Sequence, residues 1–493
     1  MTETLVALEG VTKTYAGITA LQDVGFTIAR GEAVCLAGEN GSGKSTLIKI
    51  LAGVEQPNSG RIAFGGVPQG ALTPRLSAEA GIKVIFQDFS LFPNLSVAEN
   101  IGFSAEIGAG TRLVRRGHVR DLARATLARI GVDIPLDAAV ETLSVAHKQL
   151  VAIARALATE ARLIIMDEPT TALTEREVRV LLDIIRRLKA DGVAVLFVSH
   201  KLAEVLEVCE KVVVLRNGQK VAEGPAHEFD SAKLTRHMTG RDVAALPPAP
   251  LPANAPELLR VDRLHKDGAF DEVSFTLRAG EVLGVSGLLG SGRTALAKAL
   301  FGLVAPDRGT ITLDGRKVPL GNPLAAAEAG IGYVPEDRLT EGLFLTQSIV
   351  QNVAIGRLDA HGRGILDMGG LMSEARDWLK RLSVKTANPD NPVRSLSGGN
   401  QQRVVLARWM ARSPRVLVLN GPSVGVDVGS KAEIHAIIAD LAAQGLGVIV
   451  ISDDLPEVLA TCHRILVMKS GQMVDEIASN SISETELAHR LAS

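Results

Sequence analysis

The stretch Gly38-Glu-Asn-Gly-Ser-Gly-Lys-Ser-Thr46 has the spacing of a phosphate-binding loop, and it follows an apolar run at Ala33–Ala37. In such a loop, glycines let backbone N–H groups curl around phosphate oxygens, a lysine neutralises their charge, and a hydroxyl ligates Mg²⁺. These roles fall to Gly38, Gly41, Gly43, Lys44 and Ser45. A helix expected over Ser45–Leu51 would direct its N-terminus at the anion. The alternative interpretation is a glycine-rich turn without a ligand.

The same pattern occurs a second time in Gly287-Leu-Leu-Gly-Ser-Gly-Arg-Thr294, where Arg293 takes the place of the lysine. The flanking sequence is repeated too, since Val24-Gly-Phe-Thr-Ile-Ala-Arg-Gly-Glu32 returns as Val273-Ser-Phe-Thr-Leu-Arg-Ala-Gly-Glu281. Between the copies, five prolines lie within residues 245–256, a composition typical of a stiff linker. We therefore predict a tandem duplication with domains at 1–242 and 257–493, joined by a proline-rich linker at 243–256.

The sequence predicts an α/β fold in each copy. Short β-branched runs alternate with helical patterns, which is typical of parallel strands covered by helices. The clearest runs are Ala33–Ala37, Leu163–Met166, Val193–Val198, Val416–Leu419 and Val448–Ile451. Helix-rich stretches at 87–144 and 336–397 interrupt this alternation, so each copy is predicted to be an α/β core with an inserted helical subdomain.

Composition limits the class of protein. The formal net charge is −2, which argues against a protein devoted to coating nucleic acid. The three cysteines lie far apart, with no metal-ligand or disulfide spacing. The N-terminus lacks a signal-peptide pattern, and no apolar run approaches the ~18 residues that a membrane helix needs. We expect no direct membrane insertion, so any membrane role would come through a partner.

A second motif of the first copy is Leu163-Ile-Ile-Met-Asp-Glu168, an apolar strand that ends in two acids. A buried strand that delivers two carboxylates to its end suits one Mg²⁺-orienting group, Asp167, and one general base for water, Glu168. The alternative is that an acid after the strand only caps the next helix.

Leu396-Ser-Gly-Gly-Asn-Gln-Gln402 resembles the signature of ABC-type ATPases, and the preceding motifs fit that family. By the same resemblance, Gln87 looks like the Q-loop glutamine, a Mg²⁺ ligand, and His200 looks like the switch histidine that contacts the γ-phosphate. Tyr15 stands where the family stacks an aromatic ring on adenine. The resemblance covers essentially the whole chain.

ABC-type sites form between two domains packed head to tail, with the signature of one domain completing the phosphate loop of the other. The resemblance implies ATP and Mg²⁺ as cofactors, and a fully equipped first site. Its catalytic residues would be Lys44, Gln87, Glu168 and His200, and its Mg²⁺ ligands Ser45, Gln87 and Asp167. Its ATP contacts would be Tyr15, Gly38, Asn40, Gly41, Ser42, Gly43, Lys44, Ser45, Thr46, Ser397, Gly398 and Gly399.

The second site departs from the family pattern at most positions. Its loop comprises Gly287, Gly290, Gly292, Arg293 and Thr294, and its signature would be Leu143-Ser-Val-Ala-His147, of which Ser144 remains. The Q-loop, Mg²⁺, base and switch positions hold Glu336, Asn420, Gly421 and Asp453. Side chains of Val145 and Ala146 replace the signature glycines. We expect one catalytic site and one structural or regulatory site, and whether the latter binds nucleotide stays open.

Segments of the second copy, such as Tyr333-Val-Pro-Glu-Asp-Arg338 and Gly425-Val-Asp-Val-Gly429, look like those of ATP-binding subunits of bacterial monosaccharide importers. The resemblance implies transmembrane permease subunits, an extracytoplasmic solute-binding protein and a peripheral location on the cytoplasmic face of the plasma membrane. The apolar loop Phe89–Leu95, matched by Phe344-Leu-Thr346, would accept a permease helix, or else pack locally. The alternative function is a soluble tandem ABC ATPase that acts on ribosomes or DNA.

Overall fold

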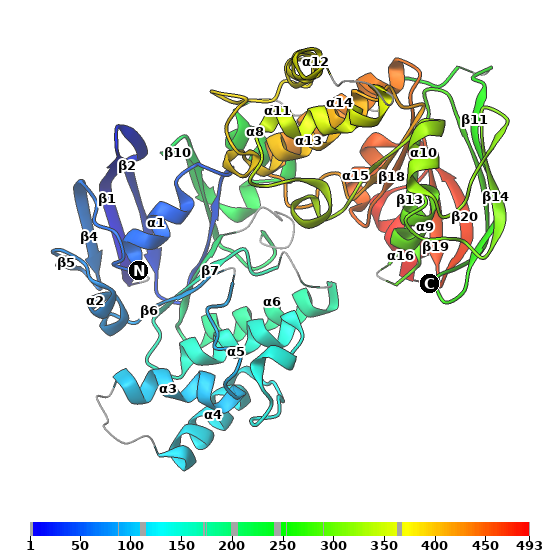
Figure 1. The fold of residues 1–493 in the computed structure, drawn as a ribbon. Coiled ribbons are helices and arrows are strands. Elements are labelled where there is room, and N and C mark those ends of the chain that lie inside the picture. The colour runs from blue at the N-terminus through cyan, green and yellow to red at the C-terminus, as the bar shows by residue number, and fades with distance from the viewer. Residues whose placement is uncertain are drawn as a thin grey trace. The chain divides into compact units, whose positions relative to one another are not determined.

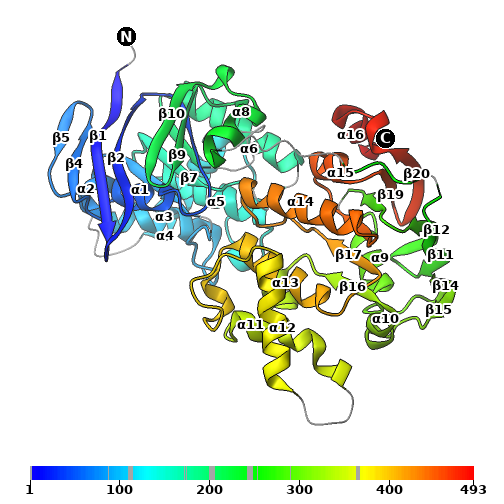
Figure 2. The same cartoon turned by 90° about the horizontal axis from the view of Figure 1, so that it is seen from above.

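The computed structural model describes residues 3–86, 88–108, 115–170, 173, 175–198, 206–240, 248–252, 254–288, 290–361 and 367–492. The chain divides into two compact units, Met1–Val243 and Ala244–Ser493. Each unit consists of an antiparallel sheet, a mainly parallel sheet and a group of helices (Figures 1 and 2).

The first unit opens with an antiparallel sheet in the order β2-β1-β4-β5. Its strands are β1 (Thr4–Tyr15), β2 (Ile18–Ala29), β4 (Ser59–Phe64) and β5 (Val67–Gln69). Buried and exposed residues alternate along β1 and β2, because one face packs on a core and the other faces solvent. The buried face includes Val11, Leu21 and Val24.

The second sheet of this unit has the order β10-β9-β3-β8-β7-β6. Its strands are β3 (Ala33–Ala37), β6 (Ile82–Ile85), β7 (Leu163–Asp167), β8 (Ala194–Val198), β9 (Lys211–Arg216) and β10 (Gln219–Pro225). All pairs are parallel except β9 with β10. Strands β3 and β8 are buried throughout, as a parallel sheet covered on both faces requires. The carboxyl ends of β3 and β7 therefore lie at one edge of the sheet, two strands apart.

The helices of the first unit lie beside this sheet, and α3, α4 and α5 are grouped together at one side of it (Figure 1). Helix α1 follows β3 directly, and α3, α4 and α5 pack on one another as the inserted helical group. The helices are α1 (Lys44–Leu51), α2 (Pro74–Glu79), α3 (Val97–Gly108), α4 (Arg116–Ile130), α5 (Val145–Leu157), α6 (Glu175–Ala190) and α8 (Ser231–Thr239), with short 3₁₀ turns η1 (Val140–Thr142) and η2 (Ala226–Glu228).

The second unit repeats this plan, with an antiparallel sheet β12-β11-β14-β15 and a six-stranded sheet β16-β17-β18-β13-β19-β20. Its strands are β11 (Glu257–Lys266), β12 (Phe270–Arg278), β13 (Val282–Ser286), β14 (Arg308–Leu313), β15 (Arg316–Val318), β16 (Ile331–Val334), β17 (Val416–Asn420), β18 (Gly447–Ile451), β19 (Arg464–Lys469) and β20 (Gln472–Ala478). The two units thus share one topology, which confirms the predicted α/β fold and its duplication.

The helices of the second unit also correspond to those of the first. They are α9 (Arg293–Leu300), α10 (Pro323–Ala329), α11 (Ile349–Ala354), α12 (Met368–Arg381), α13 (Gly398–Met410), α14 (Val428–Ala443), α15 (Leu455–Thr461) and α16 (Glu484–Ala492), with a π turn η3 (Arg338–Gly342) and 3₁₀ turns η4 (Ile355–His361), η5 (Val393–Ser395) and η6 (Ser479–Ser481). Helix α13 packs on α11 and α12, as α5 packs on α3 and α4. None of the helices in the described part of the chain is long and apolar enough to cross a membrane.

Candidate active site

The loop of residues 38–43 connects β3 to α1, so a buried strand and a helix fix its two ends. Gly41 and Gly43 have φ angles of 82° and 105°, in the region that favours glycine. Close packing also requires Gly43, because an added Cβ would lie 2.6 Å from the Ala20 carbonyl oxygen. The backbone of the loop is therefore fixed in a curled form that few other residues could adopt.

Lys44 lies across this loop. Its Nζ donates hydrogen bonds to the carbonyl oxygens of Gly38 and Glu39, at 2.6 and 2.9 Å. The Ser42 hydroxyl is buried and has no hydrogen-bond partner among the described residues. No side chain caps the first turn of α1 within the described chain, where Gly43 is the N-cap residue. An ammonium group and uncapped N–H groups together form a site suited to a phosphate.

Asp167 and Glu168 lie at the carboxyl end of β7, as the sequence predicted. Burial raises the pKa of Asp167, and the neighbouring charge of Glu168 raises it further, whereas the charge of Lys44 lowers it. Asp167 is therefore within electrostatic reach of Lys44. Glu168 has a φ angle of 50°, and its backbone N–H donates to the Val198 carbonyl at 2.8 Å. A glutamate in left-handed backbone is strained, a condition common at functional positions.

The chemistry of these side chains fits a magnesium ion. Ser45 offers a hydroxyl on the first turn of α1, and Asp167 offers a carboxylate at the end of β7. Mg²⁺ prefers hard oxygen ligands of these kinds. Burial and the charge of Glu168 both disfavour the ionised carboxylate of Asp167, and a bound cation would favour it.

The two signature segments differ in what their serines bind. Ser144 caps α5 in the usual manner, because its hydroxyl accepts the His147 N–H at 3.2 Å. Ser397 makes no such bond within the described chain, and its hydroxyl instead accepts the Asn400 side-chain N–H at 3.0 Å. The first turn of α13 thus keeps its backbone N–H groups uncapped by side chains. Ser397, Gly398 and Gly399 can therefore offer donors to an anion, whereas in the segment Leu143–His147 the His147 N–H already donates to Ser144.

Two predicted catalytic residues, Gln87 and His200, lie outside the described residues. Tyr15 ends β1, its side chain is partly exposed, and the Lys13 Nζ lies 4.9 Å from its ring centroid. Of the other predicted ATP contacts, Asn40 and Ser45 are exposed and Thr46 is partly buried on α1. Asn40 lies on the loop, and Ser45 and Thr46 lie on the first turn of α1.

A scan against family models matches the ABC transporter family at residues 21–171 and again at residues 270–424. The chain belongs to the ABC transporter family. It is therefore a tandem ABC-type ATPase, and ATP is the nucleotide that its phosphate loop binds. The two matched segments coincide with the two repeated folds, and each contains a phosphate loop and the strand of the acidic motif.

Relatives in the family match over nearly the full chain. A protein of Streptomyces avermitilis named ribose import ATP-binding protein RbsA 2 is 42% identical, covering 97% of this chain and 95% of that protein. Ribose import ATP-binding protein RbsA 3 of Rubrobacter xylanophilus is 43% identical, covering 98% and 97%. Among solved structures, a dimeric post-hydrolysis state of the ATP-binding cassette MJ0796 bound to ADP and Pi is 28% identical and covers 46% of this chain and 100% of that chain, with a TM-score of 0.42.

In the second unit, the phosphate loop has the same backbone but different side-chain partners. Gly290 and Gly292 have φ angles of 86° and 95°, close to those of Gly41 and Gly43. The Arg293 Nη1 donates to the Gly287 carbonyl, much as Lys44 does to Gly38. Its Nη2, however, lies 3.2 Å from the Asp453 carboxylate, at the position of the family's switch histidine. An internal carboxylate therefore pairs with the cation that would meet a phosphate.

Two further positions of this unit lack the carboxylates that the first unit has there. Asn420 ends β17 where Asp167 ends β7, and it is 2% exposed. Gly421 follows with a φ angle of 60° and donates its N–H to the Ile451 carbonyl at 2.8 Å, the same backbone geometry as Glu168. The left-handed conformation is thus retained where the base has been replaced by glycine.

The first hairpin of the second unit is also shorter. Val11 pairs with Val24, thirteen residues later, whereas Leu264 pairs with Val273, nine residues later. The shorter hairpin turns at residues 267–269, and no aromatic residue corresponds to Tyr15. The second unit therefore has no ring at the place where the first unit presents Tyr15.

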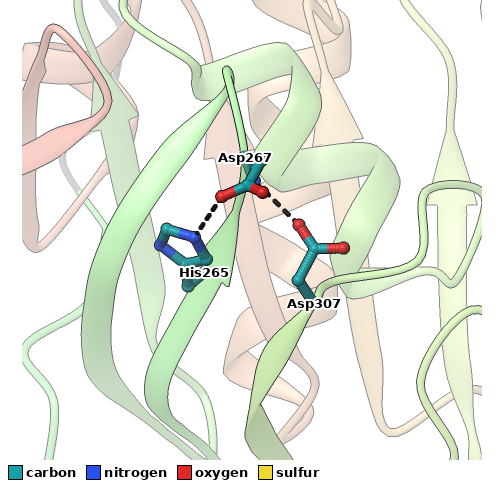
Figure 3. Close-up of side chains that lie close together, drawn as sticks. All are labelled: His265, Asp267 and Asp307. Carbon is teal, nitrogen blue, oxygen red and sulfur yellow. Dashed lines mark hydrogen bonds and ion pairs between the residues drawn. The ribbon is translucent and has the colours of Figure 1, made fainter.

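A charged cluster occupies this hairpin turn, and Figure 3 shows its His265, Asp267 and Asp307 side chains. The His265 ring nitrogens lie 2.8 Å from Asp267 and 2.6 Å from Asp271, and these hydrogen bonds raise the pKa of His265. The Asp307 carboxylate accepts the Lys266 ammonium and the Asp267 N–H. Both ring nitrogens of His265 are therefore engaged by carboxylates within this cluster.

Both units present an exposed phenylalanine from a firmly held loop. Phe92 and Phe344 are 58% and 52% exposed. A buried asparagine binds the backbone N–H and carbonyl of each, Asn100 for Phe92 and Asn352 for Phe344, at 2.9 and 3.0 Å. The aromatic rings are thus displayed while their backbone is fixed.

In each unit, an arginine of the helix that follows the signature segment, α5 or α13, also donates hydrogen bonds to this loop. Arg155 of α5 donates to the carbonyls of Phe89 and Ser90, both of which have positive φ angles. Arg408 of α13 donates to the Gly342 carbonyl and to Asn352. Burial lowers the pKa of Arg408 to about 10. A pocket of about 390 Å³ adjoins this loop in the second unit, lined by Leu324, Ile355, Leu358, Arg408 and Trp409 among others.

Several of these residues were not among the sequence predictions. The Arg293–Asp453 pair, the asparagine clamps and the two arginines join positions that are far apart in the sequence. The asparagines could have been found from the repeat, because Asn100 and Asn352 follow the two apolar loops at the same spacing. No motif in the sequence indicated the arginines.

Proposed function

We propose that this protein hydrolyses ATP to drive import of a monosaccharide of the ribose type, with one competent and one degenerate ATP site. The near-complete coverage of relatives named as ribose import ATP-binding proteins supports the substrate class. The observation that carries the asymmetry is the difference between the strand ends: Asp167 and Glu168 lie at the end of β7, whereas Asn420 and Gly421 lie at the end of β17. In the second unit, Arg293 also pairs with Asp453.

At the competent site, each residue of the first unit has a distinct task. The loop N–H groups and Lys44 bind the phosphates and neutralise their charge. Glu168 accepts the proton of the attacking water, and its fixed backbone holds the carboxylate in place for that transfer. Gln87 and His200 complete the catalytic set, as Q-loop and switch residues. Tyr15 stacks on adenine.

A magnesium ion held by Ser45, Gln87 and Asp167 would neutralise charge on the β- and γ-phosphates. The position of Asp167 at the carboxyl end of β7, beside Glu168, supports this ligand. We further propose that the two units, residues 1–242 and 257–493, act head to tail, so that Ser397, Gly398 and Gly399 contribute donors to the γ-phosphate. The uncapped first turn of α13 supports this role.

The degenerate site, by contrast, would not hydrolyse ATP. Gly421 stands in place of the base, Asn420 stands in place of the Mg²⁺-orienting acid, and Arg293 is paired with Asp453. Loss of a general base alone typically costs ~10²–10⁴ in rate. The Val145 and Ala146 side chains and the capping bond of Ser144 remove donors from the signature that would complete it.

The partners would be permease subunits in the membrane and an extracytoplasmic solute-binding protein, with this chain peripheral on the cytoplasmic face. The exposed rings of Phe92 and Phe344 support docking of permease helices, because each is displayed on a rigid loop next to the helical group. A docked helix would cover both the ring and, in the second unit, the pocket beside Arg408.

The test is uptake of labelled pentoses, hexoses, inositol and nucleosides by a strain that lacks this gene. The strain is restored with wild type, Glu168→Gln, or the control Glu9→Gln, which changes an exposed glutamate of β1. We expect ribose-type uptake to be rescued by wild type and by the control, but not by Glu168→Gln. Normal uptake of every compound, with impaired translation or DNA repair, would overturn the importer and favour a soluble ATPase.

A further inference from the structure

The segment that follows the predicted Q-loop position is longer in the second unit than in the first. Eight positions separate Glu336 from Phe344, whereas five separate the matching Gln87 from Phe92. The longer segment contains the π turn η3, residues Arg338–Gly342. Asp337 caps this turn, accepting the N–H groups of Leu339 and Thr340 at 2.9 and 3.3 Å. The turn is therefore an ordered insertion, and Arg338 is its first residue.

Arg338 points away from solvent and binds a different loop. Its Nη1 donates to the Val424 carbonyl at 2.6 Å, and its Nη2 donates to the Gly425 carbonyl at 2.8 Å. The side chain is buried, and burial lowers the pKa of its guanidinium although Asp337 partly opposes this. Burial of a cation is costly unless hydrogen bonds compensate it. The two carbonyl bonds thus fix the loop between β17 and α14.

The same guanidinium lies against the signature. A Cβ added at Gly398 would come within 2.7 Å of the Arg338 Nη2 and equally close to the Gly425 carbonyl oxygen. One added at Gly399 would lie 2.3 Å from the Ser430 Cβ, near the start of α14. The N-terminus of α13 therefore rests on the loop and helix whose position Arg338 determines, and both signature glycines are needed for that approach.

The placement also matters for charge. The N-terminus of α13 carries a partial positive charge, so a neighbouring guanidinium is unfavourable there without an anion. Together they concentrate positive potential beside Ser397, Gly398 and Gly399. A phosphate that meets this segment would be favoured by both.

We propose that Arg338 is a positioning residue for the intact signature, holding Ser397–Gly399 in the geometry that hydrolysis requires. This inference rests on the proposed function, in which that signature serves the ATP bound by the first unit. Arg338 does not touch ATP itself, and it acts through the Val424–Gly425 loop and the start of α13. Because Phe344 lies on the same segment, the inserted turn connects the permease-facing loop with the signature.

The experiment uses the assembled transporter, purified through a tag on this chain and reconstituted in lipid vesicles, with ATP hydrolysis measured against ATP concentration. The variants are Arg338→Gln and Arg338→Lys. The matched control is Glu341→Gln, which lies on the same turn and pairs with Lys298 at 3.1 Å at the protein surface. Unfolding of each variant is measured in parallel, so that kinetic constants are compared only for folded protein.

We expect Arg338→Gln to lower kcat by roughly 10- to 100-fold, since small misplacements of catalytic groups have effects of this size. KM should change little, because ATP first binds to residues of the first unit. Arg338→Lys should recover part of kcat, as it keeps the charge but loses the paired donors. It also serves for the comparison if Arg338→Gln does not fold.

A kcat for folded Arg338→Gln or Arg338→Lys equal to that of wild type would overturn the inference while leaving the proposed function intact. Equal losses in Glu341→Gln would overturn it too, because the effect would then belong to the turn as a whole. Hydrolysis that does not depend on Glu168 would overturn the proposed function and this inference together.

Discussion

The Nη2 atom of Arg293 lies 3.2 Å from the Oδ2 atom of Asp453, and the two residues occupy the positions at which the family has a lysine and a histidine. Replacement of the lysine alone would leave a cation for a phosphate, since an arginine still carries a charge. Asp453 supplies to this arginine the negative charge that a phosphate would otherwise bring. In the second unit, the cation of the phosphate loop thus already has an anionic partner within the same unit.

We therefore predict that Asp453→Asn increases anion binding at the second loop. The measurement is ATP bound per chain in a Lys44→Ala background, which disables the first loop. Relief of the competing carboxylate should raise the affinity at least about tenfold, or ~1.4 kcal/mol. Asp440→Asn, on the exposed side of α14, makes the same charge change and should have no effect. Unchanged binding in Asp453→Asn would contradict this prediction.

The left-handed backbone at Glu168 leads to a second prediction. Glu168→Gly and Glu168→Ala should both abolish hydrolysis. The glycine variant should be the more stable by about 1 kcal/mol, because a φ angle of 50° strains alanine but not glycine. Hydrogen exchange of β7 measures this difference. In the second unit, Gly421→Ala should be destabilising, since its Cβ would lie 2.8 Å from Val424 Cγ2. Equal stability of the two Glu168 variants would argue against strain.

A third prediction concerns acid stability of the second unit. Glu457 is buried and accepts hydrogen bonds from Ser452 at 2.5 Å and from His435 at 3.1 Å. Burial disfavours its charge, but the His435 hydrogen bond and the charge of Lys431 outweigh burial and lower the pKa of Glu457. A lowered pKa in the folded state contributes stability that is present above the ordinary value of ~4.3 and is lost as pH falls through the lowered pKa.

Glu457→Gln should accordingly cost about 1–3 kcal/mol at pH 7 and flatten the loss of stability below pH ~4.3. Denaturant unfolding at several pH values provides the measurement. Glu328→Gln, an exposed residue of α10, serves as the control and should keep the wild-type pH dependence. A variant that follows the wild-type curve would show that Glu457 is not the group responsible.

The asparagine clamps give a fourth prediction. Asn352→Ala and Asn100→Ala should each cost roughly 1–3 kcal/mol, because buried backbone groups of the phenylalanine lose their partners. The loss should be larger for Asn352, whose Oδ1 also accepts Arg408 at 2.9 Å. Both variants should recover less permease when purified, whereas Asn94→Ala, exposed on the same loop as Phe92, should behave as wild type. If both variants recovered as much permease as wild type, the two asparagines would not contribute to permease docking.

Much of the fold could be predicted because local patterns dictate it. The apolar runs at 33–37, 163–166 and 448–451 are strands, since β-branched residues covered on both faces have few alternatives. The helix after the first loop begins at Lys44, one residue earlier than predicted, which is within the usual uncertainty of a helix end. The duplication could be predicted because the phosphate loop and its flanking sequence both occur twice.

The candidate site was only partly predictable. Residues within a motif, such as Lys44, Asp167 and Glu168, lie where the motif implies, because a strand end or a loop positions them. Gln87 and His200 lie outside the described residues and stay predictions. The partners of Arg293 and Arg338 could not be predicted, since each long side chain selects a carbonyl or carboxylate that only the folded chain brings near.

The asparagine clamps have a consequence for the membrane subunits. The chemistry of the two units has diverged, yet each still displays one phenylalanine held at both backbone groups by one buried asparagine. If the proposed docking holds, the membrane subunits would meet the same asparagine-held phenylalanine on each unit, although the two ATP sites differ. A permease made of two like subunits could then use one kind of contact on both units.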